Sequence, residues 1–368
     1  MRYESGYQGV NMAAVVESVV RLPELRGFVV RCMQAVGATK EHAEPLADLL
    51  VSADYRGHYS HGLNRLDMYM KELESGIAVS GDVEPTVVKQ TAATALVDGH
   101  NVLGPVVGKF CIDLAIAKAR TAGIGWVSAK GSNHFGIAGW YSIRASEQGL
   151  IGMAFTNTSP LMVPTRAKEV TLGTNPISVA APANGDSFVL DMATTAVALG
   201  KVEIQERKGE EIPLGWAVDK TGTATPNPSA ATGLLPLGGT EHTSGYKGYG
   251  LGMMVEMFCG IMSGGAYGPH VRKWKTCDKI ANLGQCFVAI DPNAFEDGFK
   301  DRMTDLIDIC RGLQPADGEE EVLIPGDPER KHMQKCDHLG GIPYHPNQIK
   351  YANDIAAKYQ LDPMEQLK

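Results

Sequence analysis

The middle of the chain alternates between segments of helical and of strand periodicity, and this alternation restricts the fold more than any other feature. Segments with helical spacing and short apolar runs follow one another at 105–122, 124–129, 137–148, 151–157, 177–181 and 188–190. Alternation at this spacing is typical of proteins in which helices cover a buried sheet. The sequence therefore predicts an α/β fold.

The length and the charge of the chain limit the classes of function that it can have. A chain of 368 residues is long enough for two or three domains, or for one large α/β domain with an addition. Its net charge of −8 makes it a poor general binder of nucleic acid or of an anionic membrane. No run of about 18 apolar residues is present to cross a membrane. A local basic pocket could still hold a small anionic substrate.

The cysteines favour a reducing compartment. There are seven, an odd number, and no two of them have the CxxC spacing of a structural zinc site. Residues 1–12 contain no apolar stretch of the length that a secretory signal needs. We therefore expect an intracellular, cytoplasmic protein without a disulfide framework.

The strongest local signal for chemistry is the segment from Ser60 to Arg65. His61 and Arg65 are four residues apart, so they share a face if a helix begins near Gly62. An imidazole exchanges a proton near neutral pH, and a guanidinium can hold a carboxylate through two parallel hydrogen bonds. The pair suits a 2-hydroxy or 2-oxo acid, with Arg65 at the carboxylate and His61 at the hydroxyl. The alternative is an ordinary surface helix start, in which Ser60 is the cap and Arg65 is solvated.

A second signal lies in 131–136, between an expected strand and the next helix. Loops at the carboxyl ends of strands form the binding crevice of α/β sheets, and a helix N-terminus offers unpaired N–H groups to an anion. A histidine at such a place, here His134, tends to be neutral, which suits a general base. The alternative is a polar loop in which Asn133 is the cap and His134 is simply hydrogen-bonded.

Three further strand-end loops, 157–160, 173–176 and 191–194, carry hydroxyl, amide and carboxylate groups that could line a nucleotide. Residues of these types also simply populate turns. Lys247 stands beside glycines at an expected helix start and could reach a phosphate. Neither the P-loop pattern nor the GxGxxG fingerprint occurs in the chain. The residues alone therefore leave the cofactor open.

His58 and His61 are three residues apart and raise the question of a metal site. No third ligand with a familiar spacing follows them, and an HxxH pair alone is weak evidence. We therefore expect a site without a metal ion, and keep a metal-dependent enzyme as an alternative.

Taken together, the motifs resemble those of one family, the type-2 malate/lactate dehydrogenases, which are NAD(P)-dependent 2-hydroxyacid oxidoreductases. This family also includes ureidoglycolate, sulfolactate and diketogulonate enzymes and cyclic imino-acid reductases. The matching motifs keep family order from about residue 22 to residue 330. They are ADYRGH (53–58), SHG (60–62), SNHFG (132–136), NTSP (157–160), LGTNP (172–176), LDMATT (190–195), IPLGWAVD (212–219), LLPLGG (234–239), KGYGL (247–251) and AIDP (289–292).

The resemblance implies a nicotinamide-binding fold without the Rossmann fingerprint, built on a central mixed sheet. It implies a mostly helical lobe formed from both chain ends, 1–95 with 310–368, on the side of the substrate and of dimer contacts. Residues 96–309 then form the cofactor-binding sheet domain, from which 208–239 extends as a long arm. A homodimer is also implied, and the apolar segment 253–258 favours it because one chain is unlikely to cover that segment alone.

The resemblance also assigns site residues. The implied substrate-site residues are Ser60, His61, Arg65 and His134. Different family members use a different one of the two histidines for proton transfer, so both stay open. The implied cofactor-binding residues are Ser159, Asp191, Met192, Ala193 and Lys247, together with Gly326 and Asp327, which stand where the family often has Gly-Glu. NAD is the favoured cofactor, and NADP is left open.

The expected activity is hydride transfer between a nicotinamide cofactor and a small 2-hydroxy or 2-oxo acid resembling malate or lactate. Reduction of a cyclic C=N bond in the same site is an alternative, because Arg65 could hold the carboxylate in either reaction. A non-catalytic protein that retains the dehydrogenase fold is a second alternative. The presence of both histidines and Arg65 in one chain argues against it.

Overall fold

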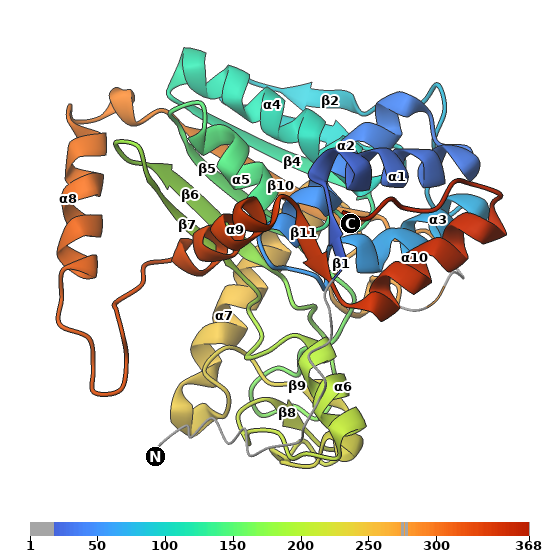
Figure 1. The fold of residues 1–368 in the computed structure, drawn as a ribbon. Helices are drawn as coiled ribbons and strands as arrows, with labels where there is room; N and C mark the ends of the chain where they lie inside the picture. The colour runs from blue at the N-terminus through green and yellow to red at the C-terminus, as the bar shows by residue number, and fades with distance from the viewer. Residues whose placement is uncertain (1–17, 274–275, 277–278, 368) are drawn as a thin grey trace.

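A computed structural model describes residues 18–273, 276 and 279–367 of the chain. Its centre is a seven-stranded mixed sheet (Figure 1). The strands in spatial order are β2 (Thr86–Gln90), β3 (Thr94–Asp98), β4 (Ile124–Ser132), β10 (Leu283–Ile290), β5 (Ile151–Thr156), β6 (Ile177–Pro182) and β7 (Ser187–Met192). The expected α/β fold with a central mixed sheet is confirmed.

Strand direction brings four strand ends to one edge of this sheet. β3 and β4 are parallel, and β10 is antiparallel to both β4 and β5. β6 is antiparallel to both β5 and β7. β3, β4, β5 and β7 therefore run in the same direction, and the loops that follow them gather at the same edge.

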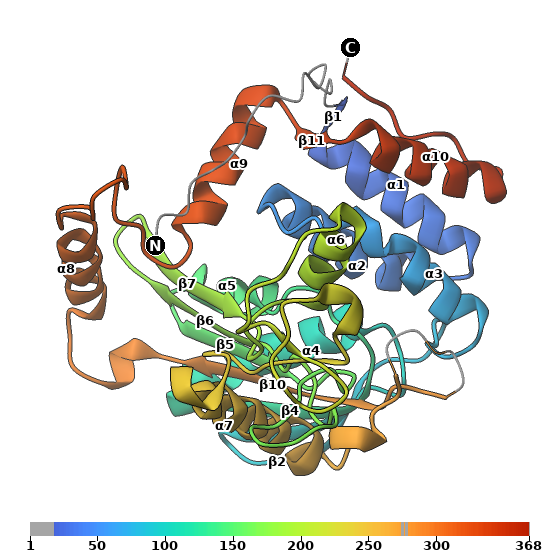
Figure 2. The same ribbon diagram turned by 90° about the horizontal axis from the view of Figure 1, so that it is seen from below.

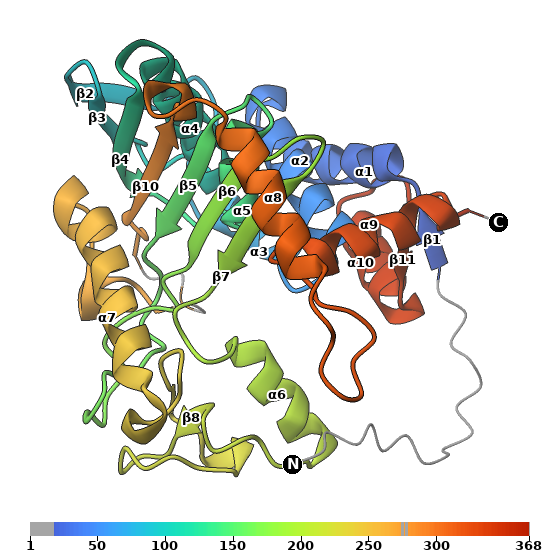
Figure 3. The ribbon, with the colours of Figure 1, turned by 90° about the vertical axis from the view of Figure 1, so that its left-hand side faces the viewer.

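Helices cover both faces of the sheet. The α-helices are α1 (Leu22–Ala35), α2 (Lys40–Tyr55), α3 (Leu66–Glu74), α4 (Gly104–Ala122), α5 (Gly139–Ser146), α6 (Leu199–Lys208), α7 (Gly245–Glu256), α8 (Phe299–Arg311), α9 (Asp327–Leu339) and α10 (Pro346–Lys358). Phe287 of β10 packs in the core shared with α4 and α5, whereas the adjacent Cys286 and Val288 pack with α7. Because neighbouring strand residues point to opposite faces, α7 lies on the face opposite α4 and α5 (Figure 3).

Both ends of the described chain meet in one group of helices. β1 (Ser18–Val20) pairs with β11 (Ile342–Tyr344), and these two short strands lie near α1, α9 and α10 (Figures 1 and 2). The proposed division into 1–95 with 310–368 and 96–309 is untested. The boundary between residues 95 and 96 falls within β3, so β2 and the first residues of β3 already belong to the sheet.

Several expected elements have different bounds. The segment 86–97, which alternates like strand material, is a hairpin in which Thr91 and Thr94 make the turn. The helix after β7, α6, begins at Leu199. The segment 208–239, expected as a loop, contains a small sheet of β8 (Ala217–Val218) and β9 (Gly233–Leu234) below the main sheet (Figure 1).

The charged segment 317–330 contains the start of α9. Gly326 has a φ of 104°, a conformation that glycine adopts easily, and the helix begins at the next residue, Asp327. Only Asp327 and Cys336 of this helix are buried. This helix is strongly polar and buries few side chains, so its sequence resembles a charged loop.

Candidate active site

The first candidate motif lies in the turn between α2 and α3. The His61 N–H donates to the His58 carbonyl (2.8 Å), and a short 3-10 helix follows at Leu63–Arg65. The helical segment thus begins beside Gly62, as expected, but His61 precedes it, so His61 and Arg65 do not share a helix face. Arg65 nevertheless returns to the turn, where its Nε donates to the Ser60 carbonyl (2.6 Å). The turn, rather than a helix, places Ser60, His61 and Arg65 together.

A buried carboxylate holds this turn in place. Asp54 of α2 is fully buried, and its Oδ2 accepts from the Leu63 N–H (2.8 Å) and from the Tyr344 hydroxyl (2.5 Å) of β11. Burial raises the pKa of Asp54 to about 7, against the effect of these two hydrogen bonds. A Cβ at Gly62 would lie 1.8 Å from Asp54 Oδ1. The glycine of the SHG motif is thus required by close approach of a carboxylate.

We expect Gly62→Ala to destabilise the fold by about 1–3 kcal/mol, because the new methyl group must displace a carboxylate that is itself buried. Thermal unfolding measures this as a lower Tm. Gly200→Ala is the matched control, since a Cβ at that helical glycine meets nothing within 4 Å and should leave Tm unchanged or slightly raised. Equal Tm values for the wild type and Gly62→Ala would contradict the steric argument.

The second motif follows β4 and carries His134. It is not at a helix N-terminus as expected, because α5 begins only at Gly139. Asn133 is also not a cap: its fully buried amide donates to the Val102 carbonyl (2.9 Å). Burial, rather than a helix end, lowers the pKa of His134 well below its ordinary value, and the neighbouring His61 and Arg65 add to the effect.

The ring of His134 is held in one tautomer. Its Nδ1 accepts from the Gly136 N–H (3.3 Å), so Nδ1 carries no proton when the ring is neutral. The hydroxyl of Tyr69 on α3 lies 2.6 Å from the same Nδ1 and is therefore the donor of that hydrogen bond. Burial raises the pKa of Tyr69 well above its usual value, which keeps this donor protonated. Neutral His134 accordingly carries its proton on Nε2.

The two motifs meet in space although 73 residues separate their histidines. The rings of His61 and His134 are stacked with their centroids 6.0 Å apart. The Ser60 hydroxyl lies 2.9 Å from His61 Nδ1. Burial, together with Arg65 and His58, lowers the pKa of His61 to about 4. Two neutral imidazoles and one guanidinium therefore share a partly buried site at neutral pH.

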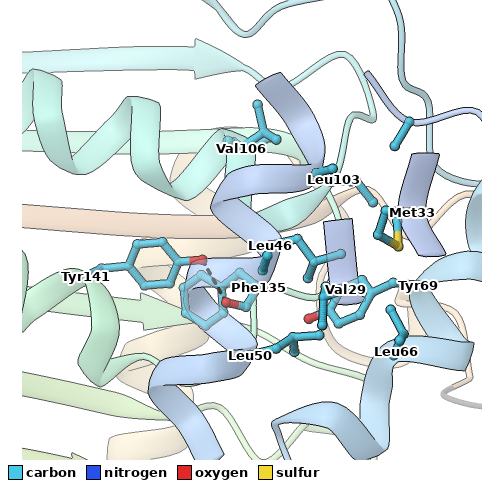
Figure 4. Packing of buried hydrophobic residues seen from close by; sticks show 14 of the residues in the cluster. Val29, Met33, Leu46, Leu50, Leu66, Tyr69, Leu103, Val106, Phe135 and Tyr141 are labelled. Carbon is cyan, nitrogen blue, oxygen red and sulfur yellow. Dashed lines mark hydrogen bonds between the residues drawn. The ribbon is translucent and has the colours of Figure 1, made fainter. Parts of the chain in front are cut away.

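The core behind this site is aromatic and rigid. Figure 4 shows Tyr141 of α5 pointing towards the backbone of Phe135, whose carbonyl accepts from the Tyr141 hydroxyl (2.7 Å). The same view shows Tyr69 among the apolar residues of the helical lobe. Phe135 is almost fully buried, so the residue next to His134 anchors its loop.

Sequence reasoning missed the link between this site and the third motif. Glu72, one helical turn after Tyr69, forms an ion pair with Arg272, and both side chains are buried. The carbonyl of Arg272 accepts from the Ser159 hydroxyl (2.7 Å), which belongs to the loop after β5. Neither Glu72 nor Arg272 belongs to a motif that could have revealed the pair.

Asp191 lies at the end of β7, beside a small pocket. Its Oδ2 accepts from the Gly139 N–H (2.7 Å), and Arg56, His58 and Glu329 line the same pocket. Burial raises the pKa of Asp191 to about 7 against the effect of this hydrogen bond. Met192 and Ala193, the next residues along the chain, are half-buried.

The remaining expected cofactor residues differ in exposure and in how far their side chains are already bonded within the protein. Lys247 is exposed in the first turn of α7, on the face opposite α5. The carboxylate of Asp327 accepts from Arg311, Arg330 and the Ile324 N–H, and these bonds hold its pKa well below the usual range. Asp327 is thus fully engaged within the protein, and Gly326 lies against Val189 of β7.

Two features of the described residues bear on function. Among them, no group of three or more His, Cys, Asp or Glu side chains could hold a metal ion. His58 Nε2 instead lies 3.6 Å from Glu329 Oε1. No helix in the described part of the chain is long and apolar enough to cross a membrane.

Comparisons with known proteins agree with this geometry. A family model described as malate/L-lactate dehydrogenase matches residues 20–352. Malate dehydrogenase from Pyrococcus abyssi is 40% identical over 371 residues, which cover 99% of this chain and 99% of that protein. The structure of malate dehydrogenase from Pyrococcus horikoshii OT3 superposes with a TM-score of 0.86 at 35% identity, covering 98% of this chain and 100% of that one.

A solved structure of an enzyme with a different name has the same fold. The δ1-piperideine-2-carboxylate reductase from Pseudomonas syringae pvar. tomato superposes with a TM-score of 0.81 at 31% identity, covering 92% of this chain and 99% of that one. The expected family is confirmed by a match over most of the chain. The chain belongs to the malate/L-lactate dehydrogenase family and is an NAD(P)-dependent dehydrogenase.

Proposed function

We propose that this enzyme interconverts a malate-like 2-hydroxy acid and its 2-oxo acid, with His61 as the proton-transfer group. The observation that carries the proposal is the pair of neutral, stacked histidines beside Arg65. Malate is the first substrate to test, because relatives with that name match nearly the whole chain. Lactate-like acids come next, since the family description names both substrates.

The residues at the sheet edge fit a nicotinamide dinucleotide. In the loop after β5, the Ser159 hydroxyl donates to the Arg272 carbonyl, so its oxygen is left to accept a hydrogen bond from a ribose hydroxyl or the carboxamide. Exposed Lys247, at the N-terminal end of α7, suits a pyrophosphate. Ser159, Asp191, Met192, Ala193 and Lys247 are the residues that we propose to hold the cofactor. For Gly326 and Asp327 we propose backbone contact only.

In the proposed mechanism, four side chains have separate roles. When bound, the nicotinamide ring takes the hydride in oxidation and returns it in reduction. In the tautomer of His61 that donates Nδ1–H to the Ser60 hydroxyl, Nε2 is available to take the substrate hydroxyl proton. His134 presents Nε2–H and stabilises negative charge on the substrate oxygen. Arg65 holds the carboxylate.

An absorbance assay tests the proposal. Purified protein is mixed with NADH or NADPH and with 2-oxo acids, including oxaloacetate and pyruvate, and oxidation of the cofactor is followed in the near ultraviolet. NAD is proposed ahead of NADP, and the parallel assays with NADH and NADPH show which cofactor the enzyme prefers. We expect turnover with a 2-oxo acid and no loss after chelation. Turnover of cyclic imines alone would instead establish an imine reductase. This alternative is tested because a piperideine-carboxylate reductase has a similar structure.

A homodimer is also proposed. Met253, Met257 and Ile261 are spaced four residues apart on α7 and its extension, and each is about half exposed. A stripe of this kind is unusual on a monomer. Light scattering at micromolar concentration should give twice the chain mass, and Met257→Glu should shift the particle towards the chain mass. A particle of one chain mass in the wild type would refute the dimer.

The compartment and the domain division complete the proposal. We propose a cytoplasmic location, which the six described cysteines support because none of them forms a disulfide with another; Cys277 lies outside the described residues. We also propose that 96–309 binds the cofactor, with 208–239 as an arm, and that 1–95 with 310–368 serves the substrate side.

A further inference from the structure

A buried carboxylate that the proposed mechanism does not use lies at the end of α7. Glu256 is 4% exposed. Its Oε1 accepts from the Asn157 side-chain amide (2.9 Å) and from the Gly268 N–H (2.8 Å), and its Oε2 accepts from the Asn175 amide (2.7 Å). In the described part of the chain it forms no ion pair. A buried acid held by neutral donors alone needs an explanation.

The donors of Glu256 belong to loops at the carboxyl edge of the sheet. Asn157 begins the loop after β5, and its Oδ1 also accepts from the Gly284 N–H of β10 (3.0 Å). Asn175 lies in the loop before β6 and has a φ of 33°, so its backbone is in a strained region. The Oδ1 of Asn175 accepts from the Thr158 N–H (3.1 Å), which ties the two loops to each other.

The same network reaches the loop after β7. The Thr158 hydroxyl accepts from the Thr174 N–H (2.9 Å). The Thr174 carbonyl accepts from the N–H and the hydroxyl of Thr194 (2.8 and 3.0 Å). Ser159 and Asp191 to Ala193, the proposed cofactor residues, stand next to these tied positions. The Glu256 carboxylate is therefore linked, directly or through this network, to three loops: the loop after β5, the loop before β6 and the loop after β7.

The helix that carries Glu256 is packed closely against the sheet. A π-helical turn, Met257–Ile261, follows it directly. A Cβ at Gly284 of β10 would lie 2.3 Å from the Cys259 carbonyl carbon, and a Cβ at Gly260 would lie 2.7 Å from Asn157 Nδ2. Helix and sheet are thus in direct backbone contact, which fixes the position from which Glu256 holds the loops.

We propose that Glu256 is a positioning residue, whose carboxylate sets the geometry of the three cofactor-side loops and so determines cofactor affinity. The inference rests on the proposed placement of the cofactor against those loops. Two carboxylate oxygens are needed because three N–H groups point at them, and an ionised carboxylate only accepts. Glutamine has the same shape but turns an NH₂ group towards one of these donors.

The test is the affinity of Glu256→Gln for the nicotinamide cofactor. The dissociation constant of NADH, or of NADPH if the wild type prefers it, is measured by fluorescence titration. We expect it to rise about tenfold, the effect of one misplaced set of contacts. The pH profile of kcat/KM should keep the limb of the proton-transfer histidine, since that site lies on α3 and the turn before it. A general loss of structure would change both the cofactor dissociation constant and the pH profile, whereas the proposal expects only the first to change.

The matched control is Asp54→Asn, which also changes a buried acid to its amide but contacts the turn that carries His61 and Tyr344 of β11, and none of the three cofactor-side loops. It should change the pH profile and leave cofactor affinity near the wild-type value. If Glu256→Gln does not fold, Asn175→Gly replaces it, because glycine adopts the positive φ easily and removes the Asn175 amide bond to Glu256. Asn175→Gly should show the same rise in dissociation constant.

Two results would overturn the inference, and they differ in what they leave standing. Wild-type affinity in folded Glu256→Gln, or in Asn175→Gly where that variant is needed, overturns the positioning role alone. A wild-type protein that binds neither NADH nor NADPH overturns the proposed function and the inference together.

Discussion

Replacing His61 by alanine should lower kcat for oxidation of the 2-hydroxy acid by about 10²–10⁴-fold, the usual contribution of a proton-transfer group. His61 acts as a base only when it is neutral. Its pKa of about 4 means that the wild type stays active well below pH 6.5 and loses kcat/KM only as the pH falls towards 4. Steady-state kinetics from pH 4 to 9, with buffer controls, should show this limb in the wild type and none in His61→Ala.

His134→Gln is the comparison that separates the two histidines. Glutamine keeps a side-chain N–H donor but cannot accept a proton, so the rate should fall less and the acid limb of His61 should remain. The tautomer argument depends on the Gly136 N–H that points at His134 Nδ1. A limb that disappears in His134→Gln and survives in His61→Ala would reverse the two roles. A limb that survives in both would refute acid–base catalysis by either residue.

The fold could be predicted where local periodicity carries it. α4, β4, α5 and β5 follow the expected segments because α4 buries one face against β4 and α5 buries one face against β5. α9 was missed because it buries little apolar surface, and β1 and β11 because they are three residues each. The insertion of β10 between β4 and β5 could not be predicted, since strand order depends on contacts more than 100 residues apart in sequence.

The site shows the same division between local and distant information. Short motifs of unusual composition contain His61, Arg65 and His134, so the chemistry of these side chains could be predicted from the sequence. Asp54, Tyr69 and Glu256 lie within or at the end of helices whose sequences look like ordinary amphipathic or apolar segments. Their partners lie 290, 65 and about 100 residues away, and only folding brings them together. Functional motifs thus indicate which groups react, while the groups that orient them remain hidden.

Replacing Arg65 by lysine should raise the KM for the 2-hydroxy acid by about 10–100-fold and change kcat little. Lysine keeps the charge but has a single ammonium in place of the planar guanidinium. Arg65 already donates Nε–H to the Ser60 carbonyl (2.6 Å), a bond that fixes the plane of the guanidinium next to His61. A lysine ammonium cannot keep that bond and also present two parallel N–H groups to a carboxylate. The loss corresponds to the weight of a hydrogen bond to a charged group, about 1.5–3 kcal/mol.

Arg166→Lys is the control, because Arg166 is 78% exposed and pairs with Glu241 on the surface. It should leave both kinetic constants unchanged. The KM-against-kcat split decides what Arg65 does. Binding that is equal in the ground state and the transition state alters KM alone, whereas a bond made only in the transition state alters kcat. A large fall in kcat at unchanged KM would therefore remove Arg65 from carboxylate binding and place it with His61 in the chemical step.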